Sequence, residues 1–267
     1  MKKKVGDILL AYEQAGAGFP VVLLHAFPLN KAMWDFQRRE LSRDYRIITP
    51  DFRGHGESAV AGGDSTTEAL AEDVHGLLAE LGIERCVLGG LSMGGYASFA
   101  FYRKYREQVV ALILADTRAQ ADTPEGRQER QKLVAVAEAE GAAGVAEQLL
   151  PKLLGATTRA SRPEVVARVR ALIHTTPVPG IIKALRGMAA RPDSRSLLPE
   201  IACPALILVG EEDTLTLPAD SAAMAQAIRG ARLEVIAQAG HLSNLEQPAA
   251  FTNHVRSFLA QVLASQT

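Results

Sequence analysis

Short runs of consecutive hydrophobic residues recur along the chain, and they limit the fold more than any other feature of the sequence. The runs are rich in β-branched residues, and most are followed by Gly, Pro or Asp and then by a segment with helical spacing of its apolar residues. Their positions are 21–24, 46–49, 86–88, 109–114, 206–209 and 233–236. Continuous hydrophobicity is typical of strands in a parallel sheet that helices cover on both faces. The pattern therefore predicts an α/β fold with a mostly parallel central sheet.

Helical patterns lie between these runs, and a hairpin precedes them. Apolar residues at helical spacing predict helices at 33–41, 67–81, 93–105, 218–228 and 248–263. The second of these is followed by Gly82, as helices commonly are. Hydrophobic residues on both sides of Gly6 and Asp7 predict a tight antiparallel hairpin at the sheet edge. Strand and helix thus alternate along most of the chain.

The alternation stops between Asp116 and Ala205. Residues 117–200 contain no convincing strand and consist of helical segments rich in Ala, Arg and Glu. Prolines punctuate these segments at Pro151, Pro163, Pro177, Pro179 and Pro192. We predict a helical insertion, or lid, at 117–200, which divides a core domain made of residues 1–116 and 201–267.

Composition excludes several classes of partner. With 29 basic and 30 acidic residues the formal charge is −1, so no positive excess is available to bind nucleic acid. The apolar runs are far shorter than the roughly 18–20 residues that cross a bilayer. The N-terminal lysines are followed by Asp7 and not by an apolar stretch, so we expect no signal peptide and a cytoplasmic protein. Cys86 and Cys203 are too few for a metal cage, and we interpret them as core residues in a protein without a metal site.

The sharpest local signal is Gly90-Leu91-Ser92-Met93-Gly94, which follows one predicted strand and opens a predicted helix. A serine on such a tight turn adopts strained backbone geometry, and the neighbouring chain leaves room only for glycine two positions before and two after it. The turn also places the hydroxyl above the carboxyl ends of the strands, where open α/β sheets bind ligands. Ser92 is therefore the predicted nucleophile.

A base must take the proton of a serine hydroxyl, and histidine is the side chain with a suitable pKa. His241 follows the last predicted strand on a loop at the carboxyl edge of the sheet, where scaffolds usually carry catalytic residues. The other histidines lie in strands, turns, helices or the insertion: His25, His55, His75, His174 and His254. We predict that His241 is the base.

The imidazole in turn needs a carboxylate that fixes its tautomer. Asp213 is well placed, because it lies on the loop leaving the strand before the one that delivers His241. Two alternatives stay open: Asp116, which also ends a predicted strand, and Glu212, which adjoins Asp213.

Attack on a carbonyl creates an oxyanion, which backbone N–H groups must stabilise. The predicted donors are Met93, directly after the nucleophile, and Phe27, in the turn after the first central strand. Pro28 cannot serve, since it has no N–H.

Five motifs, taken in their order along the chain, resemble those of the α/β-hydrolase superfamily, and the resemblance covers essentially the whole chain. The matching segments are 25–28, 51–58, 90–95, 210–213 and 240–241. Within the superfamily the chain is similar to small lidded esterases, non-haem perhydrolases and 3-oxoadipate enol-lactonases, which share a Phe-Pro-Leu sequence and a downstream Met-Trp like Met33-Trp34. The resemblance implies the α/β-hydrolase fold with a helical lid, and the order Ser92, Asp213, His241 is that of the family.

One residue departs from the pattern of these relatives, and one short segment resembles a motif of another protein class. Ala26 stands where these relatives usually have glycine, which adds a methyl group beside the oxyanion turn. Gly54-His55-Gly56 suggests a dinucleotide loop, but no helix begins immediately after it, so we expect no nucleotide cofactor.

A serine nucleophile also argues against dehalogenation, because water cannot cleave the ether that alkylation of serine would leave.

The predicted activity is hydrolysis of small to medium, largely apolar carboxylic esters or lactones through an acyl-enzyme, without a cofactor. Phe27 and Trp34 are the predicted substrate-binding residues, with Arg118 as the cation that an acidic lactone would require; near-zero net charge favours uncharged esters. The lid residues that are candidates to line the pocket are Leu153, Leu154, Ile173, Ile181, Ile182, Leu185 and Met188. Perhydrolysis, thioester hydrolysis and carbon–carbon bond cleavage remain alternative activities, and so does ligand binding without catalysis. For the oligomeric state, both a monomer and a homodimer stay open.

Overall fold

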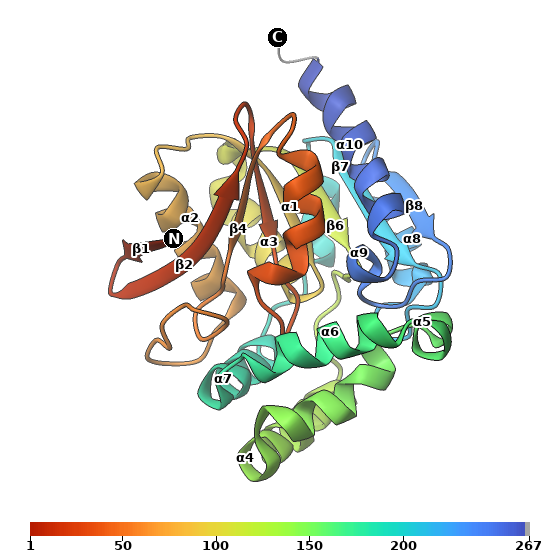
Figure 1. Cartoon of the computed structure of the whole chain (residues 1–267). Helices are drawn as coiled ribbons and strands as arrows, with labels where there is room; N and C mark the ends of the chain where they lie inside the picture. The colour runs from red at the N-terminus through yellow and green to blue at the C-terminus, as the bar shows by residue number, and fades with distance from the viewer. Residues whose placement is uncertain (265–267) are drawn as a thin grey trace.

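The computed structural model describes residues 1–264, and an eight-stranded sheet with the order β1-β2-β4-β3-β5-β6-β7-β8 forms its centre (Figure 1). The strands are β1 (Lys2–Val5), β2 (Ile8–Ala15), β3 (Pro20–Leu24), β4 (Arg46–Pro50), β5 (Cys86–Leu91), β6 (Val109–Ala115), β7 (Ala205–Gly210) and β8 (Arg232–Ile236). The hairpin strands β1 and β2 pair antiparallel, and β2 joins β4 antiparallel. All pairings from β4 to β8 are parallel. The predicted fold class is confirmed.

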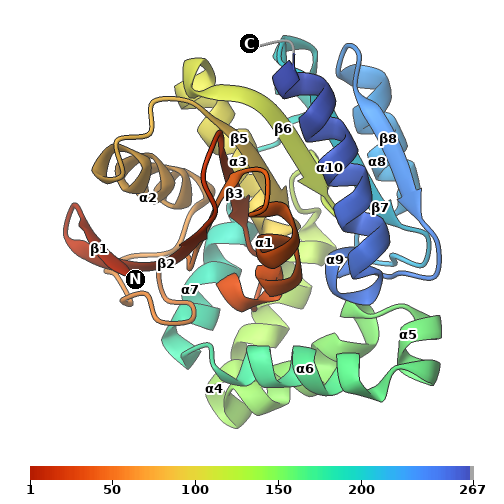
Figure 2. The ribbon, with the colours of Figure 1, turned by 45° about the horizontal axis from the view of Figure 1, so that its top comes forward.

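Helices cover both faces of the sheet, which explains why its central strands are hydrophobic throughout. Helices α1 and α10 pack on one face, whereas α2, α3 and α8 lie on the other (Figures 1 and 2). Their bounds are α1 (Asp35–Leu41), α2 (Thr67–Glu80), α3 (Met93–Tyr105), α8 (Pro218–Ala227), α9 (Ser243–Glu246) and α10 (Pro248–Ala264). Short 3₁₀ helices are η1 (Lys31–Trp34), η2 (Arg106–Gln108) and η3 (Arg195–Glu200). Within residues 1–264 no helix is long and apolar enough to cross a membrane.

Four consecutive helices between β6 and β7 form a layer at the carboxyl ends of the parallel strands (Figures 1 and 2). They are α4 (Pro124–Leu153), α5 (Ala156–Ser161), α6 (Pro163–His174) and α7 (Val178–Ala189), and together we call them the cap. Helix α4 packs against both α6 and α7. The long break in the strand pattern of the sequence therefore corresponds to this layer.

One detail of the cap differs from expectation, because Pro151 lies inside α4 and does not interrupt it. The helix ends at Leu153, so the proline removes a backbone donor close to the last turn, where one lost hydrogen bond is tolerated. The bend in α4 lies instead at Gly141, whose φ of 68° is not helical. Glycine accepts this conformation without the steric cost that a Cβ atom would bring.

Helix α7 approaches the core at two glycines. A Cβ atom on Gly180 would overlap the carbonyl oxygen of Gly54, and one on Gly187 would overlap that of Ser65. Between them, the Ser65 N–H donates to the Lys183 carbonyl at 3.2 Å. Backbone packed directly on backbone thus fixes α7 to the loop between β4 and α2.

The strand register brings five chain segments to one edge of the sheet. Strand β5 continues through Gly89 and Gly90, beyond the predicted end at residue 88, and runs directly into Ser92. The relevant neighbours are Leu24 with Gly90, Leu91 with Ala115, Ala115 with Leu208, and Gly210 with Ile236. The residues that follow β3, β5, β6, β7 and β8 therefore meet beneath the cap.

Candidate active site

Ser92 occupies the tight turn between β5 and α3. Its φ of 55° and ψ of −112° lie outside the regions that residues with side chains favour. A Cβ atom on Gly90 would overlap the backbone of Gly94, and one on Gly94 would overlap the carbonyl of Leu24. The strained serine and the two obligatory glycines are as the sequence led us to expect.

Three buried side chains form a hydrogen-bonded chain at this turn. Ser92 Oγ lies 2.8 Å from His241 Nε2, and His241 Nδ1 lies 2.8 Å from Asp213 Oδ2. Since the carboxylate can only accept, Nδ1 carries the proton and donates it to Asp213. Nε2 is then free to accept the hydrogen bond of the Ser92 hydroxyl. The structure thus brings together the predicted nucleophile, base and acid, although they lie far apart in the sequence.

Asp213 is held in place by four hydrogen bonds. Its Oδ1 accepts the N–H groups of Leu215 at 2.8 Å and Thr216 at 3.0 Å, while Oδ2 accepts the Thr216 hydroxyl at 2.7 Å besides His241. Burial alone would raise the pKa of Asp213, but His241 and Thr216 lower it below its usual value. Burial would likewise lower the pKa of His241, yet the charge of Asp213 raises it above 6.5.

Neither alternative acid forms a hydrogen bond with His241, which is paired with Asp213. Asp116 accepts hydrogen bonds from the Gly210 N–H at 2.8 Å and from the Ser243 hydroxyl at 2.5 Å. Its complete burial, and then the charge of Asp213, raise its pKa well above the usual value. Glu212 turns toward the cap, where it accepts the Thr157 N–H at 2.9 Å. Asp213 is thus the carboxylate that the geometry favours.

The two predicted oxyanion donors lie next to this chain of side chains. Met93 is the first residue of α3, so its N–H has no acceptor within the helix. Phe27 lines the same cavity as Ser92 and His241. Ala26 is fully buried beside it, and its N–H points at Met33 Sδ at 3.2 Å. The alanine is therefore accommodated within the turn.

A cavity of about 190 Å³ opens beside Ser92 and is roofed by the cap. Of the candidate lid residues, Leu153, Leu185 and Met188 line it. The other four are not among its lining residues; Ile173 and Ile181, for example, are fully buried inside the cap. Apolar lining residues that the sequence did not indicate are Tyr96, Leu133, Leu149 and Leu215.

Trp34 does not reach this cavity, which corrects the prediction that it binds substrate. It is almost fully buried in the core, where its ring lies 5.9 Å from that of Phe251. Closeness in sequence to the oxyanion turn was misleading, since η1 turns the indole away from the cavity and toward α10.

One wall of the cavity carries charges. Arg118 lines it as predicted, and so does Arg130, while the buried Asp122 binds both of them and Arg191 as well. The Arg191 guanidinium also lies 4.1 Å above the ring of Tyr96. Burial would raise the pKa of Asp122, but Arg130 and Arg191 hold it below its usual value. The Nε of Arg118 is buried and has no hydrogen-bond partner among the described residues.

A second hollow of about 570 Å³ adjoins the first between α4 and α7. The two share Arg130 and Leu185, and the outer hollow is also lined by Arg127 and Arg186. No acidic residue of the described chain lines this outer hollow. Arginines therefore border the cavity on the side of the cap. Within residues 1–264 no cluster of His, Cys, Asp and Glu is suited to a metal ion.

Comparison with known proteins agrees with this architecture. Residues 20–248 match the alpha/beta hydrolase fold family. A thermophilic esterase from Thermogutta terrifontis, solved with malate bound, is 44% identical and superimposes with a TM-score of 0.96 over 98% of this chain and 99% of that chain. An enol-lactonase from Burkholderia xenovorans is 32% identical, with a TM-score of 0.90 over 97% of this chain and 100% of that chain. The 3-oxoadipate enol-lactonase 1 of Acinetobacter baylyi is 30% identical over 91% of this chain and 89% of its own length. The chain belongs to the alpha/beta hydrolase fold family.

Proposed function

We propose that the protein is a serine hydrolase that cleaves carboxylic esters or lactones through an acyl-enzyme. The observation that carries the proposal is the hydrogen-bonded chain from Ser92 through His241 to Asp213, which ends at a cavity. The similarity to proteins named esterase and enol-lactonase supports an ester bond as the target. No step of this chemistry requires a cofactor.

In the proposed mechanism His241 takes the proton of Ser92 as the oxygen attacks the carbonyl carbon. The negative charge that develops on the carbonyl oxygen is stabilised by the N–H groups of Phe27 and Met93. His241⁺ remains paired with Asp213, and returns the proton to the leaving alcohol as the acyl-enzyme forms. Water, activated by the same histidine, then releases the acid and restores Ser92. In a lactone the leaving alcohol stays attached to the acyl chain.

We further propose that the helical segment 117–200 acts as a lid domain on a core of residues 1–116 and 201–267. Supporting this, helices α4 and α7 contribute lining residues to the cavity, whereas Ser92, His241 and Asp213 all come from loops that follow core strands. The chemistry is thereby assigned to the core, whereas the cavity wall is shared between the core and the helical segment.

The charged wall favours a substrate that carries an anionic group in addition to its ester or lactone. Asp122 balances only one of the three arginines that it binds, and the nearby Glu129 is largely exposed and paired with Lys132. A partly buried excess of positive charge is costly until an anion neutralises it. The expectation of a charge-poor cleft therefore gives way to a preference for carboxylate-bearing esters or lactones.

A fluorophosphonate probe tests the catalytic assignment. We expect the probe to modify Ser92, and Ser92→Ala to abolish both labelling and the hydrolysis of p-nitrophenyl acetate and butyrate. Ser221→Ala is the control, because Ser221 is a buried serine outside the cavity and its hydroxyl has no hydrogen-bond partner among the described residues. Equal activity of Ser92→Ala and the wild type would exclude the mechanism. Faster turnover with hydrogen peroxide than with water as acyl acceptor would favour the perhydrolase alternative.

The preference for an anionic group is tested with two esters of equal chain length, the p-nitrophenyl monoester of glutaric acid and p-nitrophenyl valerate. We expect the wild type to favour the acidic ester in kcat/KM, and Arg118→Gln to reduce that preference about 10-fold or more, since a lost charged hydrogen bond costs about 1.5–3 kcal/mol. Arg39→Gln, on the exposed side of α1, should leave the ratio unchanged. An unchanged ratio in Arg118→Gln would exclude this substrate class and leave ester hydrolysis intact.

A further inference from the structure

A chain of hydrogen bonds links the cap to the turn that carries Phe27. The hydroxyl of Thr176, in the connection between α6 and α7, donates to the Pro28 carbonyl at 2.7 Å. At the other end of that peptide unit, the Leu29 N–H donates to the Ala26 carbonyl at 2.9 Å. The Ala26 carbonyl belongs in turn to the peptide unit whose N–H is that of Phe27.

The geometry of these peptide units sets the direction of the last donor. Neither the Ala26–Phe27 bond nor the Pro28–Leu29 bond is cis, so in each unit the C=O and the N–H point in opposite directions. Holding the Ala26 carbonyl toward Leu29 therefore aims the Phe27 N–H the other way. The dipoles run head to tail from the threonine hydroxyl to this N–H, and each hydrogen bond in such a chain polarises the next.

We propose that Thr176 is a positioning residue that orients and polarises the Phe27 N–H, so that the cap itself completes the oxyanion hole. The inference rests on the proposed function, because it gives Phe27 the role of oxyanion donor. It goes further in making a residue of the helical insertion, which touches no reacting atom, part of the stabilisation of the transition state.

The core secures the other side of the same turn through His25. His25 Nε2 accepts the Phe52 N–H at 2.9 Å, which leaves Nδ1 to donate to the Ala26 carbonyl at 2.9 Å. Burial lowers the pKa of His25 to about 4, so the ring stays neutral and can keep both roles. The Ala26 carbonyl therefore accepts two hydrogen bonds. One comes from His25 of the core, and the other comes from the Leu29 N–H, which belongs to the series of hydrogen bonds that starts at Thr176 of the cap.

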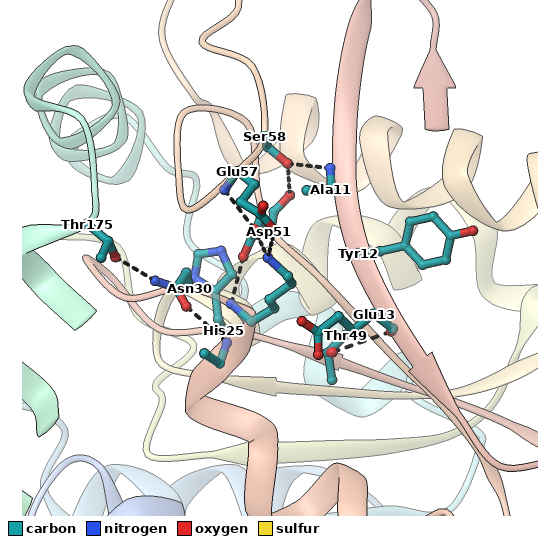
Figure 3. Close-up of polar contacts among 12 residues, drawn as sticks. Ala11, Tyr12, Glu13, His25, Asn30, Thr49, Asp51, Glu57, Ser58 and Thr175 are labelled. Atoms are coloured by element: carbon teal, nitrogen blue, oxygen red, sulfur yellow. Dashed lines mark hydrogen bonds and ion pairs between the residues drawn. The ribbon is translucent and has the colours of Figure 1, made fainter. Parts of the chain in front are cut away.

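A second contact ties the cap to this turn. Asn30 Nδ2 donates to Thr175 Oγ1 at 2.8 Å (Figure 3). Asn30 Oδ1 accepts the Ala32 N–H at 2.9 Å. Asn30 and Thr176 are both buried. Two adjacent threonines of the cap thus contact both halves of the turn, so displacement of the α6–α7 connection would remove the cap's contribution to orienting the Phe27 N–H and leave only the contacts made by the core.

The test compares Thr176→Val, which keeps the shape and removes the hydroxyl, with Thr176→Ser, which restores the donor. Losing an oxyanion donor outright costs about 10²–10³ in kcat, and weakening it through the relay should cost about 10-fold. We expect kcat for p-nitrophenyl butyrate to fall by that factor in Thr176→Val while KM changes less than about two-fold. Inhibition by an alkyl trifluoromethyl ketone, which forms a tetrahedral oxyanion on serine, should weaken equally. Thr176→Ser should recover both.

Thr158→Val is the matched control, because Thr158 is a buried cap threonine whose hydroxyl has no partner among the described residues. It should leave kcat and inhibition unchanged. Should Thr176→Val fail to fold, Thr176→Cys, a weaker donor, provides the same two readouts with a smaller loss.

A readout independent of activity is the amide proton of Phe27 in NMR spectra, which should move upfield in Thr176→Val as the relay weakens. Unchanged kcat, inhibition and amide shift in a folded Thr176→Val protein would overturn the inference, as would a loss confined to KM. Failure of the proposed function looks different, since the wild type itself would then show no hydrolysis that depends on Ser92.

Discussion

Replacing Asp213 by asparagine provides the most demanding test of the site, because the structure fixes how the new amide must lie. Oδ1 of Asp213 accepts two backbone N–H groups, those of Leu215 and Thr216, so the amide oxygen has to take that position. The amide NH₂ then faces His241 Nδ1 and donates to it. Nδ1 must become the acceptor and Nε2 must carry the proton, so His241 can no longer accept the proton of Ser92.

The expected loss in kcat is about 10⁴-fold, as for the same change in a serine protease triad, or about 5 kcal/mol at about 1.36 kcal/mol per factor of ten. Hydrolysis of p-nitrophenyl acetate under saturating conditions measures it, with circular dichroism to confirm folding. Glu212→Gln is the control, because Glu212 is adjacent to Asp213 in the sequence but its side chain binds Thr157 and not His241. A loss below about 10-fold in Asp213→Asn would refute the assignment. A larger loss in Asp116→Asn than in Asp213→Asn would transfer the role to Asp116.

Three further outcomes follow from the structure. The charge of Asp213 raises the pKa of His241, and only the neutral ring accepts a proton. We therefore expect kcat/KM to fall as the pH drops, with a midpoint above pH 6.5 in the pH–rate profile. A midpoint below pH 6.5 would contradict this. Lys31→Met leaves the buried Asp51 without its cation, which should cost about 3 kcal/mol and lower Tm by about 6–12 °C in calorimetry. Lys104→Met, at an exposed ion pair, should leave Tm nearly unchanged, and equal shifts would refute the distinction. Gly94→Ala forces the serine turn away from β3. Fluorophosphonate labelling should slow about 100-fold, because a displacement of about 1 Å can reduce the rate by that factor. Labelling at the wild-type rate would show that the turn tolerates a methyl group.

The parts of the fold, and of the arrangement of the candidate site residues, that could be predicted from the sequence are those that local chemistry determines. Buried parallel strands must be hydrophobic on both faces, so their positions could be read directly. The turn at Ser92 needs glycine on both sides, and Asp213 and His241 follow strands whose ends the parallel order brings to one edge. These signals need no knowledge of long-range packing.

The features that could not be predicted depend on contacts between distant segments. Asp122 meets Arg191 across 69 positions, and no spacing in the sequence indicates that pair. Trp34 was placed at the cavity because of its neighbours in sequence, but packing against Phe251 decides its position. Tyr96 is the exception, since it lies one helical turn after Ser92 on α3, a signal that would have indicated a lining residue.

The glycine contacts of α7 have a consequence for how the substrate range of this protein can change. Gly180 and Gly187 press directly on core backbone, so almost any substitution there would lift the cap and disturb the relay that starts at Thr176. Helix α4 contributes side chains such as Leu133 and Leu149 to the cavity wall and has no such constraint at these positions. Mutational drift, or a directed-evolution library, is therefore expected to accumulate altered specificity at lining positions such as Leu133 and Leu149 while Gly180 and Gly187 stay nearly invariant.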